Sequence, residues 1–200
     1  IYSKDALFAN YQKKSKYKNP ISMSLKNQLS THEHLKLKKL CSKLKLKYSC
    51  TAFDLKSLIF LDKELNVPFF KIASGEIHSI DMLEYISKSN KPVILSSGMS
   101  TFNDVKQSLK ILQKHKKKNI TLLHCVSSYP TRLQDMNLKR IDNLKEKFNL
   151  DIGLSDHSLS DIPAIIAVTK SAKVIEKHVT ISRKLKGPDH KASLEIPEFD

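Results

Sequence analysis

Two histidines stand where a pair of imidazoles could hold a metal ion. His157 comes three residues after the strand-like run 151–154, and His178 comes directly after the run 173–177. The two are 21 residues apart, about the length of one strand–helix–strand unit. Because the carboxyl ends of neighbouring parallel strands meet at one edge of a sheet, both rings can face a single point and predict a metal site there. The alternative is a pair of structural core histidines.

A lysine and several hydroxyls near the ends of other apolar runs predict a binding site for a small anion. Lys71 lies inside the run 69–73, where a buried ammonium group needs an anionic partner or a lowered pKa. A lysine that extends from the strand end into solvent is the alternative. The hydroxyls that could join Lys71 around a phosphate or carboxylate are those of Ser74, Ser96, Ser127 and Ser155.

Three acidic residues are candidates for acid–base chemistry or substrate contacts. Glu76 could act as an acid or base, or simply stand at a helix start. Glu176 shares a strand face with His178, because side chains alternate along a strand, so it could be a metal ligand, the partner of a ligand, or half of a buried ion pair. Asp189 lies in a glycine–proline turn, from which it could accept hydrogen bonds from a sugar hydroxyl.

The chain alternates short apolar runs with amphipathic segments, which is typical of an α/β fold with a parallel sheet. The runs predict strands at 46–52, 68–73, 92–96, 120–126, 151–154 and 173–180. The amphipathic segments predict helices at 54–65, 80–89, 102–117, 137–147 and 160–171, and Thr31 could cap an earlier helix through 35–46. An open doubly wound sheet and a (βα)8 barrel both fit this order. Polar residues after nearly every strand favour the barrel, whose strand ends all meet at one mouth.

Composition limits the classes of partner. The net charge is +15, but 32 of the 35 basic residues are lysines and three are arginines, whereas base and phosphate recognition favours arginine. We therefore expect no nucleic-acid partner. No apolar stretch reaches the ~20 residues that cross a bilayer, so we expect no membrane partner. Three cysteines without CxxC spacing indicate a reducing compartment and a cytoplasmic protein.

Six segments together resemble the sialic acid synthase family, which comprises N-acetylneuraminate synthases and their legionaminate and pseudaminate relatives. They are Lys71–Glu76, Ile94–Met99, Leu122–Cys125 with Tyr129–Thr131, Gly153–His157, Ile175–His178 and Gly187–Leu194. The Ser-Gly-Glu and Gly-Pro-Asp-His-Lys sequences are closer to the sialate and legionaminate branches than to the pseudaminate branch.

The resemblance implies a (β/α)8 barrel enzyme that condenses phosphoenolpyruvate with an N-acetylmannosamine-type sugar and releases phosphate, and whose full-length members form homodimers. It implies that His157 and His178 hold a divalent metal, usually Mn²⁺, although imidazole also suits Mg²⁺ or Co²⁺ sites. Glu76 and Asp189 would contact the sugar or the attacking water. Phosphoenolpyruvate would be bound by Lys71, Ser74, Ser96 and Ser155, with Thr51 and Tyr129 nearby.

The resemblance also implies a partial barrel. Residues 46–200 would supply strands three to eight, preceded by a loop and helix at 1–45, with the family's first two strand–helix units and its C-terminal antifreeze-like domain absent. Open sheet edges would then make the isolated chain poorly active and prone to aggregation. The alternatives to a synthase are a truncated, inactive barrel that only binds ligand and another metal-dependent barrel enzyme, such as a hydrolase.

Overall fold

The computed structural model describes residues 20–115 and 119–200, and the chain divides into two compact units, Ile1–Pro68 and Phe69–Asp200. The described part of the first unit is helical. Its helices are α1 (Pro20–Asn27), α2 (Thr31–Lys43) and α3 (Leu55–Lys63). A capping box starts α2, because Ser30 Oγ accepts from the amide of Glu33 and the Glu33 carboxylate accepts from the amide of Ser30. The predicted cap, Thr31, is therefore the first helical residue instead.

Two other expectations for this unit are wrong. Residues 20–27 form α1 where a loop is predicted, while the rest of that predicted loop, 1–19, lies outside the described residues. The strand predicted at 46–52 is not formed, apart from an isolated bridge at Thr51. Residues 46–50 are irregular backbone that follows the end of α2, where Lys45 takes a left-handed φ of 57° and closes the helix. Leu46 is 61% exposed, so it buries no strand face.

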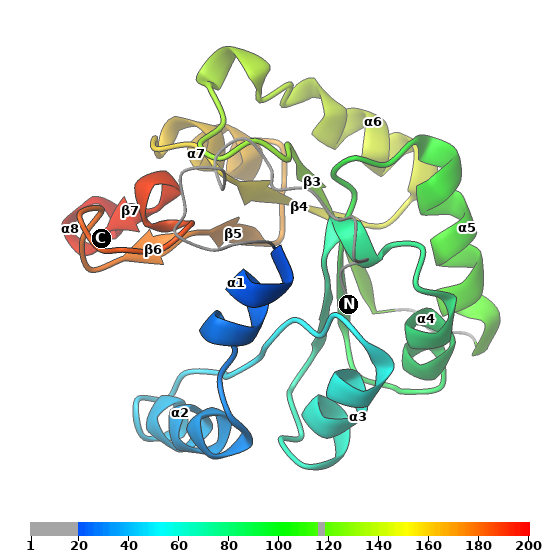
Figure 1. Ribbon diagram of the computed structural model, residues 1–200. Helices are drawn as coiled ribbons and strands as arrows, with labels where there is room; N and C mark the ends of the chain where they lie inside the picture. Colours follow the sequence, from blue (N-terminus) through cyan, green and yellow to red (C-terminus); the bar gives the residue numbers. More distant parts are fainter. Residues whose placement is uncertain (1–19, 116–118) are drawn as a thin grey trace. The chain divides into compact units, whose positions relative to one another are not determined.

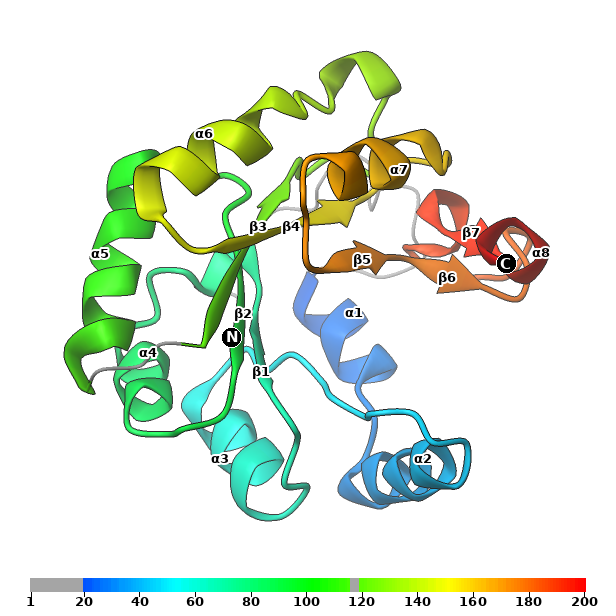
Figure 2. The same ribbon diagram turned by 180° about the vertical axis from the view of Figure 1, so that it is seen from behind.

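The second unit is built on a five-stranded parallel sheet whose strands follow one another in chain order. They are β1 (Phe70–Ile72), β2 (Val93–Ser96), β3 (Ile120–Cys125), β4 (Asp151–Asp156) and β5 (Ile175–Lys177). The helices between them are α4 (Ile80–Ser87), α5 (Phe102–Leu112), α6 (Lys139–Phe148) and α7 (Ile162–Thr169). Figures 1 and 2 show a curled sheet with these helices along its outer side. An α/β fold with a half-barrel sheet is thus confirmed; the number of missing strands stays a prediction.

Burial explains why the strands read as continuous apolar runs. Leu122 and Leu123 are adjacent in β3 and point to opposite faces, yet both are fully buried. Helix starts agree with the sequence as well. Thr101 and Asp104 form a capping box at the start of α5, and Pro163 lies in the first turn of α7. Helix α5 ends at Leu112 and a 3-10 turn follows at Gln113–His115, earlier than predicted. None of the helices in the described part of the chain is both long enough and apolar enough to cross a membrane.

The single strand predicted at 173–180 is divided in two at His178. Its first part, β5, pairs with β4, whereas the second, β6 (Val179–Thr180), pairs in parallel with β7 (Leu194–Glu195), just before the short helix α8 (Ile196–Phe199). The carbonyl of His178 accepts a hydrogen bond from the amide of Leu194 at 2.9 Å. His178 therefore lies where the backbone leaves one sheet and joins another.

Gly153 is the glycine whose replacement the sheet tolerates least. A Cβ there would overlap the carbonyl oxygen of Val174 and lie 2.5 Å from Cδ2 of Leu123. Backbone on the neighbouring strand cannot move without breaking the ladder, so we expect Gly153→Ala to lower the free energy of unfolding by about 3 kcal/mol in urea titrations. Gly75→Ala is the matched control, because nothing lies within 4 Å of its added Cβ. Equal midpoints for the two variants would contradict this packing.

Candidate active site

Side-chain alternation on β4 and β5 divides two sequence motifs between the two faces of the sheet. In the parallel ladder Ser155 lies opposite Glu176, and Asp156 lies opposite Lys177. The first pair points to the inner, concave face and the second to the outer face. His157 continues the alternation on the inner side, together with Ser155 and Glu176.

An ammonium group on the first strand reaches a carboxylate on the last. Lys71 Nζ donates to Ser96 Oγ at 2.9 Å and lies 3.4 Å from Oε2 of Glu176. β1 and β5 are the two edges of the sheet, so this ion pair crosses the concave face. The Lys71 side chain is 12% exposed and that of Glu176 is 36% exposed. The predicted anionic partner of Lys71 is thus a residue of the protein, which leaves a charge-balanced pair beside two serine hydroxyls.

Ser155 connects this pair to the histidines. Its hydroxyl donates to Oε1 of Glu176 at 2.6 Å and lies 3.2 Å from Nε2 of His157. The other ring nitrogen, Nδ1, lies 2.7 Å from the carbonyl oxygen of Val126. A carbonyl can only accept, so Nδ1 carries the proton and Nε2 presents a lone pair to the inner face.

Three aromatic rings gather at the same strand ends. The Tyr129 ring stacks on His157 with centroids 4.2 Å apart, and its centroid lies 5.6 Å from that of His178. The two imidazoles meet edge to face, with centroids 5.3 Å apart and planes at 86°. The amide of Thr131 donates to the carbonyl of His157 at 2.9 Å, which ties the loop after β3 to the end of β4.

Burial favours the neutral form of two groups on the inner face, His157 and Cys125. Burial lowers the pKa of His157, and the hydrogen bond to Val126 opposes this only in part. Burial also raises the pKa of the Cys125 thiol, which keeps it protonated. Cys125 lies opposite Ser155 in the ladder, on the inner face, and was not among the predicted site residues. Alternation along β3 was the signal that could have found it.

The donor set suits a metal ion only in part. In residues 20–115 and 119–200 no three His, Cys, Asp or Glu side chains are grouped to hold a metal. The two imidazoles could supply two ligands, with oxygen atoms of solvent or substrate supplying the others. Nε2 of His157 faces the Ser155 hydroxyl, whose single proton is donated to Glu176. The lone pair of Nε2 therefore receives no proton from Ser155, and a bound cation would satisfy it. A neutral imidazole whose second nitrogen is fixed by a carbonyl fits such a ligand.

Several predicted site residues lie together, and others do not. The gathered residues are Lys71, Ser96, Tyr129, Ser155, His157, Glu176 and His178. Glu76 accepts from Ser79 Oγ at 2.6 Å and so belongs to the 3-10 turn Ser74–Glu76 and the start of α4.

The remaining predicted residues have other positions. Ser127 is exposed and packs near Gly98, where an added Cβ would come 2.8 Å from its hydroxyl oxygen. Asp189 heads the 3-10 turn His190–Ala192. Thr51 belongs to the other unit, so its contact with a substrate stays a prediction.

Comparison with known proteins decides the family. The NeuB family model matches residues 1–200. The chain belongs to the NeuB family. It is 41% identical over 181 residues to N,N'-diacetyllegionaminic acid synthase of Campylobacter jejuni, covering 90% of this chain and 54% of that protein. It is 42% identical over 172 residues to an uncharacterized protein of Methanocaldococcus jannaschii, covering 86% and 51%.

A solved structure agrees with this assignment. The N-acetylneuraminic acid synthetase of Leptospira borgpetersenii superposes with a TM-score of 0.84 at 38% identity, covering 89% of this chain and 62% of that one. The resemblance to sialic acid synthases is therefore confirmed. The NeuB-family chain described here spans about half the length of the curated relatives it matches.

His124 of this NeuB-family chain gives a pH-dependent stability. It is buried on the outer face of β3, its Nε2 lies 2.8 Å from the carbonyl of Met136, and its Nδ1 has no hydrogen-bond partner among the residues that the structure describes. Burial lowers its pKa, so the unfolded chain, protonating near pH 6.5, binds the proton first as pH falls. The free energy of unfolding should therefore decrease below about pH 6.5, by at most ~1.4 kcal/mol per pH unit for this residue.

Unfolding titrations across this pH range test the assignment. His124→Gln keeps a donor for the carbonyl of Met136 and should reduce the slope of the free energy of unfolding against pH. Buried His157 contributes a slope of the same sign, so part of the pH dependence should remain. His78→Gln, on an exposed histidine, is the control variant. A wild-type slope in His124→Gln would show that His124 is not the group responsible.

Proposed function

We propose that this chain carries the catalytic strand ends of a nonulosonic acid synthase. The reaction condenses phosphoenolpyruvate with an N-acetylmannosamine-type sugar to give a sialic or legionaminic acid and phosphate. The relatives named as sialic and legionaminic acid synthases support the product class. The observation that carries the proposal is the continuous contact from Lys71 through Glu176 and Ser155 to His157 on one concave face.

Charge balance favours an anionic substrate beside a divalent metal. Lys71 and Glu176 cancel, and His157 is held neutral by burial, so the protein groups alone are close to neutral. A divalent cation on the two imidazoles would add two positive charges, which offset most of the charge of phosphoenolpyruvate. Lys71, Ser96 and Ser155 would then bind its phosphate or carboxylate, with Ser74 and Ser127 near the rim.

The chemistry balances with water as the only other reactant. The methylene carbon of phosphoenolpyruvate forms a bond to the aldehyde carbon of the sugar, and the aldehyde oxygen takes up a proton. Water adds to C2 and supplies that proton, the bond from C2 to the phosphate oxygen breaks, and the new hydroxyl gives its remaining proton to the departing phosphate as the ketone forms. When bound, a metal such as Mn²⁺ would polarise the aldehyde as a Lewis acid.

The protein would orient both substrates. Tyr129, stacked on His157, would form a wall of the pocket and limit access of bulk water. Glu176 would set the position of Ser155 and Lys71 and could take part in proton transfer. Glu76 and Asp189 are assigned to the sugar or to the attacking water by resemblance, and assembly as a homodimer rests on the same ground.

A chimera tests the function. Residues 1–200 would replace the matching half of the Campylobacter jejuni legionaminic acid synthase, and phosphate release from phosphoenolpyruvate would be followed with Mn²⁺. The acceptors would be N-acetylmannosamine and the corresponding diacetamido-trideoxy sugar. We expect release with one sugar, which names the branch, and its loss in His157→Ala. A chimera that unfolds cooperatively but releases no phosphate with either sugar would favour a barrel that only binds ligand.

Lys71→Met in the same chimera tests the anion site. Loss of the ammonium group leaves Glu176 without its counter-charge and removes a bond to the substrate. A charge-assisted hydrogen bond is worth about 2–3 kcal/mol, so kcat/KM for phosphoenolpyruvate should fall about 30–150-fold. Lys170→Met, which removes a half-exposed lysine bound to Asp142, is the matched control. Equal kinetics in the two variants would exclude Lys71 from the site.

A further inference from the structure

A second ion pair lies behind the candidate site, on the outer face of the sheet. Lys177 Nζ is 2.6 Å from Oδ2 of Asp156, and the two side chains are 6% and 0% exposed. They lie opposite each other on the last rung shared by β4 and β5. On the rung before, Ser155 is bonded to Glu176 on the inner face. Two successive rungs are thus cross-linked by side chains on opposite faces of the sheet.

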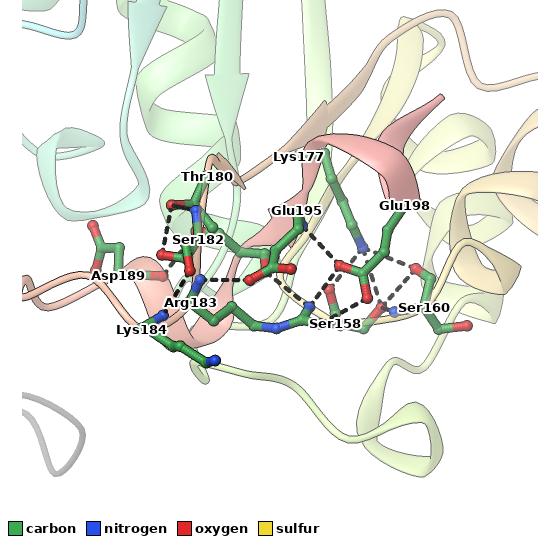
Figure 3. Close-up of polar contacts among 11 residues, drawn as sticks. Ser158, Ser160, Lys177, Thr180, Ser182, Arg183, Lys184, Asp189, Glu195 and Glu198 are labelled. Atoms are coloured by element: carbon green, nitrogen blue, oxygen red, sulfur yellow. Dashed lines mark hydrogen bonds and ion pairs between the residues drawn. The ribbon is translucent and has the colours of Figure 1, made fainter.

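Lys177 also fixes the chain that follows β4. Its ammonium group donates to the carbonyl oxygens of Ser158 at 2.7 Å and Ser160 at 2.9 Å, so its three protons are all used. Figure 3 shows the Lys177 side chain directed at both serines. The other carboxylate oxygen of Asp156 accepts from the amide of Ser158 at 2.8 Å. The residue before His157 is therefore a member of the buried ion pair, and the residue after His157 is hydrogen-bonded to both members of the pair.

The position of this pair matters because the ladder ends there. β4 stops at Asp156 and β5 stops at Lys177, so His157 and His178 are the first residues beyond the paired strands. Backbone pairing between β4 and β5 no longer sets the distance between them. Each histidine adjoins one member of the ion pair in sequence, while its ring points to the opposite face.

We propose that Asp156 and Lys177 are positioning residues that fix the separation of His157 and His178. The pair touches neither substrate nor metal in this account and acts through the two backbones. Stability alone is a weaker reason for its presence, because buried ion pairs are often replaced by apolar residues without loss of stability. The part of the inference that concerns Mn²⁺ rests on the proposed function, whereas the part that concerns the imidazoles does not.

The first test measures Mn²⁺ affinity. Free Mn²⁺ would be titrated by electron paramagnetic resonance with the 200-residue chain and its Lys177→Met variant. Groups that orient metal ligands typically change affinity 10–100-fold, so we expect the dissociation constant to rise by about that factor. Lys170→Met should leave it within about twofold, because its lysine pairs with Asp142 on the helical layer.

Lys177→Met leaves a buried carboxylate without a counter-ion and can reduce the yield of folded protein. The double variant Asp156→Asn/Lys177→Gln removes both charges and keeps polar groups, so it is the second arm. Thermal unfolding would be recorded for each. A raised dissociation constant in a double variant with a near-wild-type midpoint supports positioning. An unchanged constant in folded variants would overturn the proposal and leave a structural pair.

The second readout keeps this inference separate from the proposed function. Imidazole ¹⁵N spectra of the metal-free chain report the tautomer and surroundings of each ring. We expect Lys177→Met to shift the resonances of His157 and His178 and to leave that of exposed His78 in place. If the wild type takes up no Mn²⁺, the metal assignment fails, but these spectra still show whether Lys177 positions the two imidazoles. Unmoved His157 and His178 resonances would overturn the positioning role.

Discussion

The site depends on one ion pair that joins the two edges of the sheet. β1 and β5 are separated by four strand spacings, which in a flat sheet would place them about 19 Å apart. Lys71 Nζ nevertheless lies 3.4 Å from the Glu176 carboxylate. The two side chains span the concavity of a curled sheet, whose helices α4 to α7 lie along its outer side. Everything on the inner face is brought together by this geometry.

Side-chain alternation along the strands then gives the inner and outer faces of the sheet different roles. On β4 and β5 the inner residues, Ser155 and Glu176, carry the polar contacts that could bind a substrate. The outer residues, Asp156 and Lys177, form a buried ion pair that faces away from them. A motif such as Glu-Lys-His therefore combines a site residue, a supporting residue and a second site residue in three consecutive positions.

The sequence predicts strands correctly where burial on both faces produces a continuous apolar run. β2, β3 and β4 are buried on both faces, so their apolar runs predicted them to within two residues. It misled at 46–52, where the chain follows a helix end closed by Lys45 in a left-handed conformation and Leu46 stays exposed. It also ran β5 and β6 together, because a change of pairing partner at His178 leaves no mark on hydropathy.

Much of the candidate site was predictable from residue type and strand position. Lys71, Ser96, Ser155, His157, Glu176 and His178 all lie within one residue of the carboxyl end of a parallel strand, and side-chain alternation turns them inward. The partners could not be predicted. The curvature of the sheet brings Glu176 to Lys71 as its ion-pair partner. Contacts between residues far apart in sequence likewise determine which groups bind Lys177.

The central claim is that an anion pocket and a metal-binding imidazole pair share one concave face. The most direct measurement is the ³¹P relaxation rate of phosphoenolpyruvate added to the chain with Mn²⁺ kept below the protein concentration. Relaxation by bound Mn²⁺ decreases steeply with distance. We expect a large increase in the relaxation rate with the wild-type chain, and we expect His157→Ala and Lys71→Met each to remove it. A rate that is the same in the wild type and both variants would contradict it.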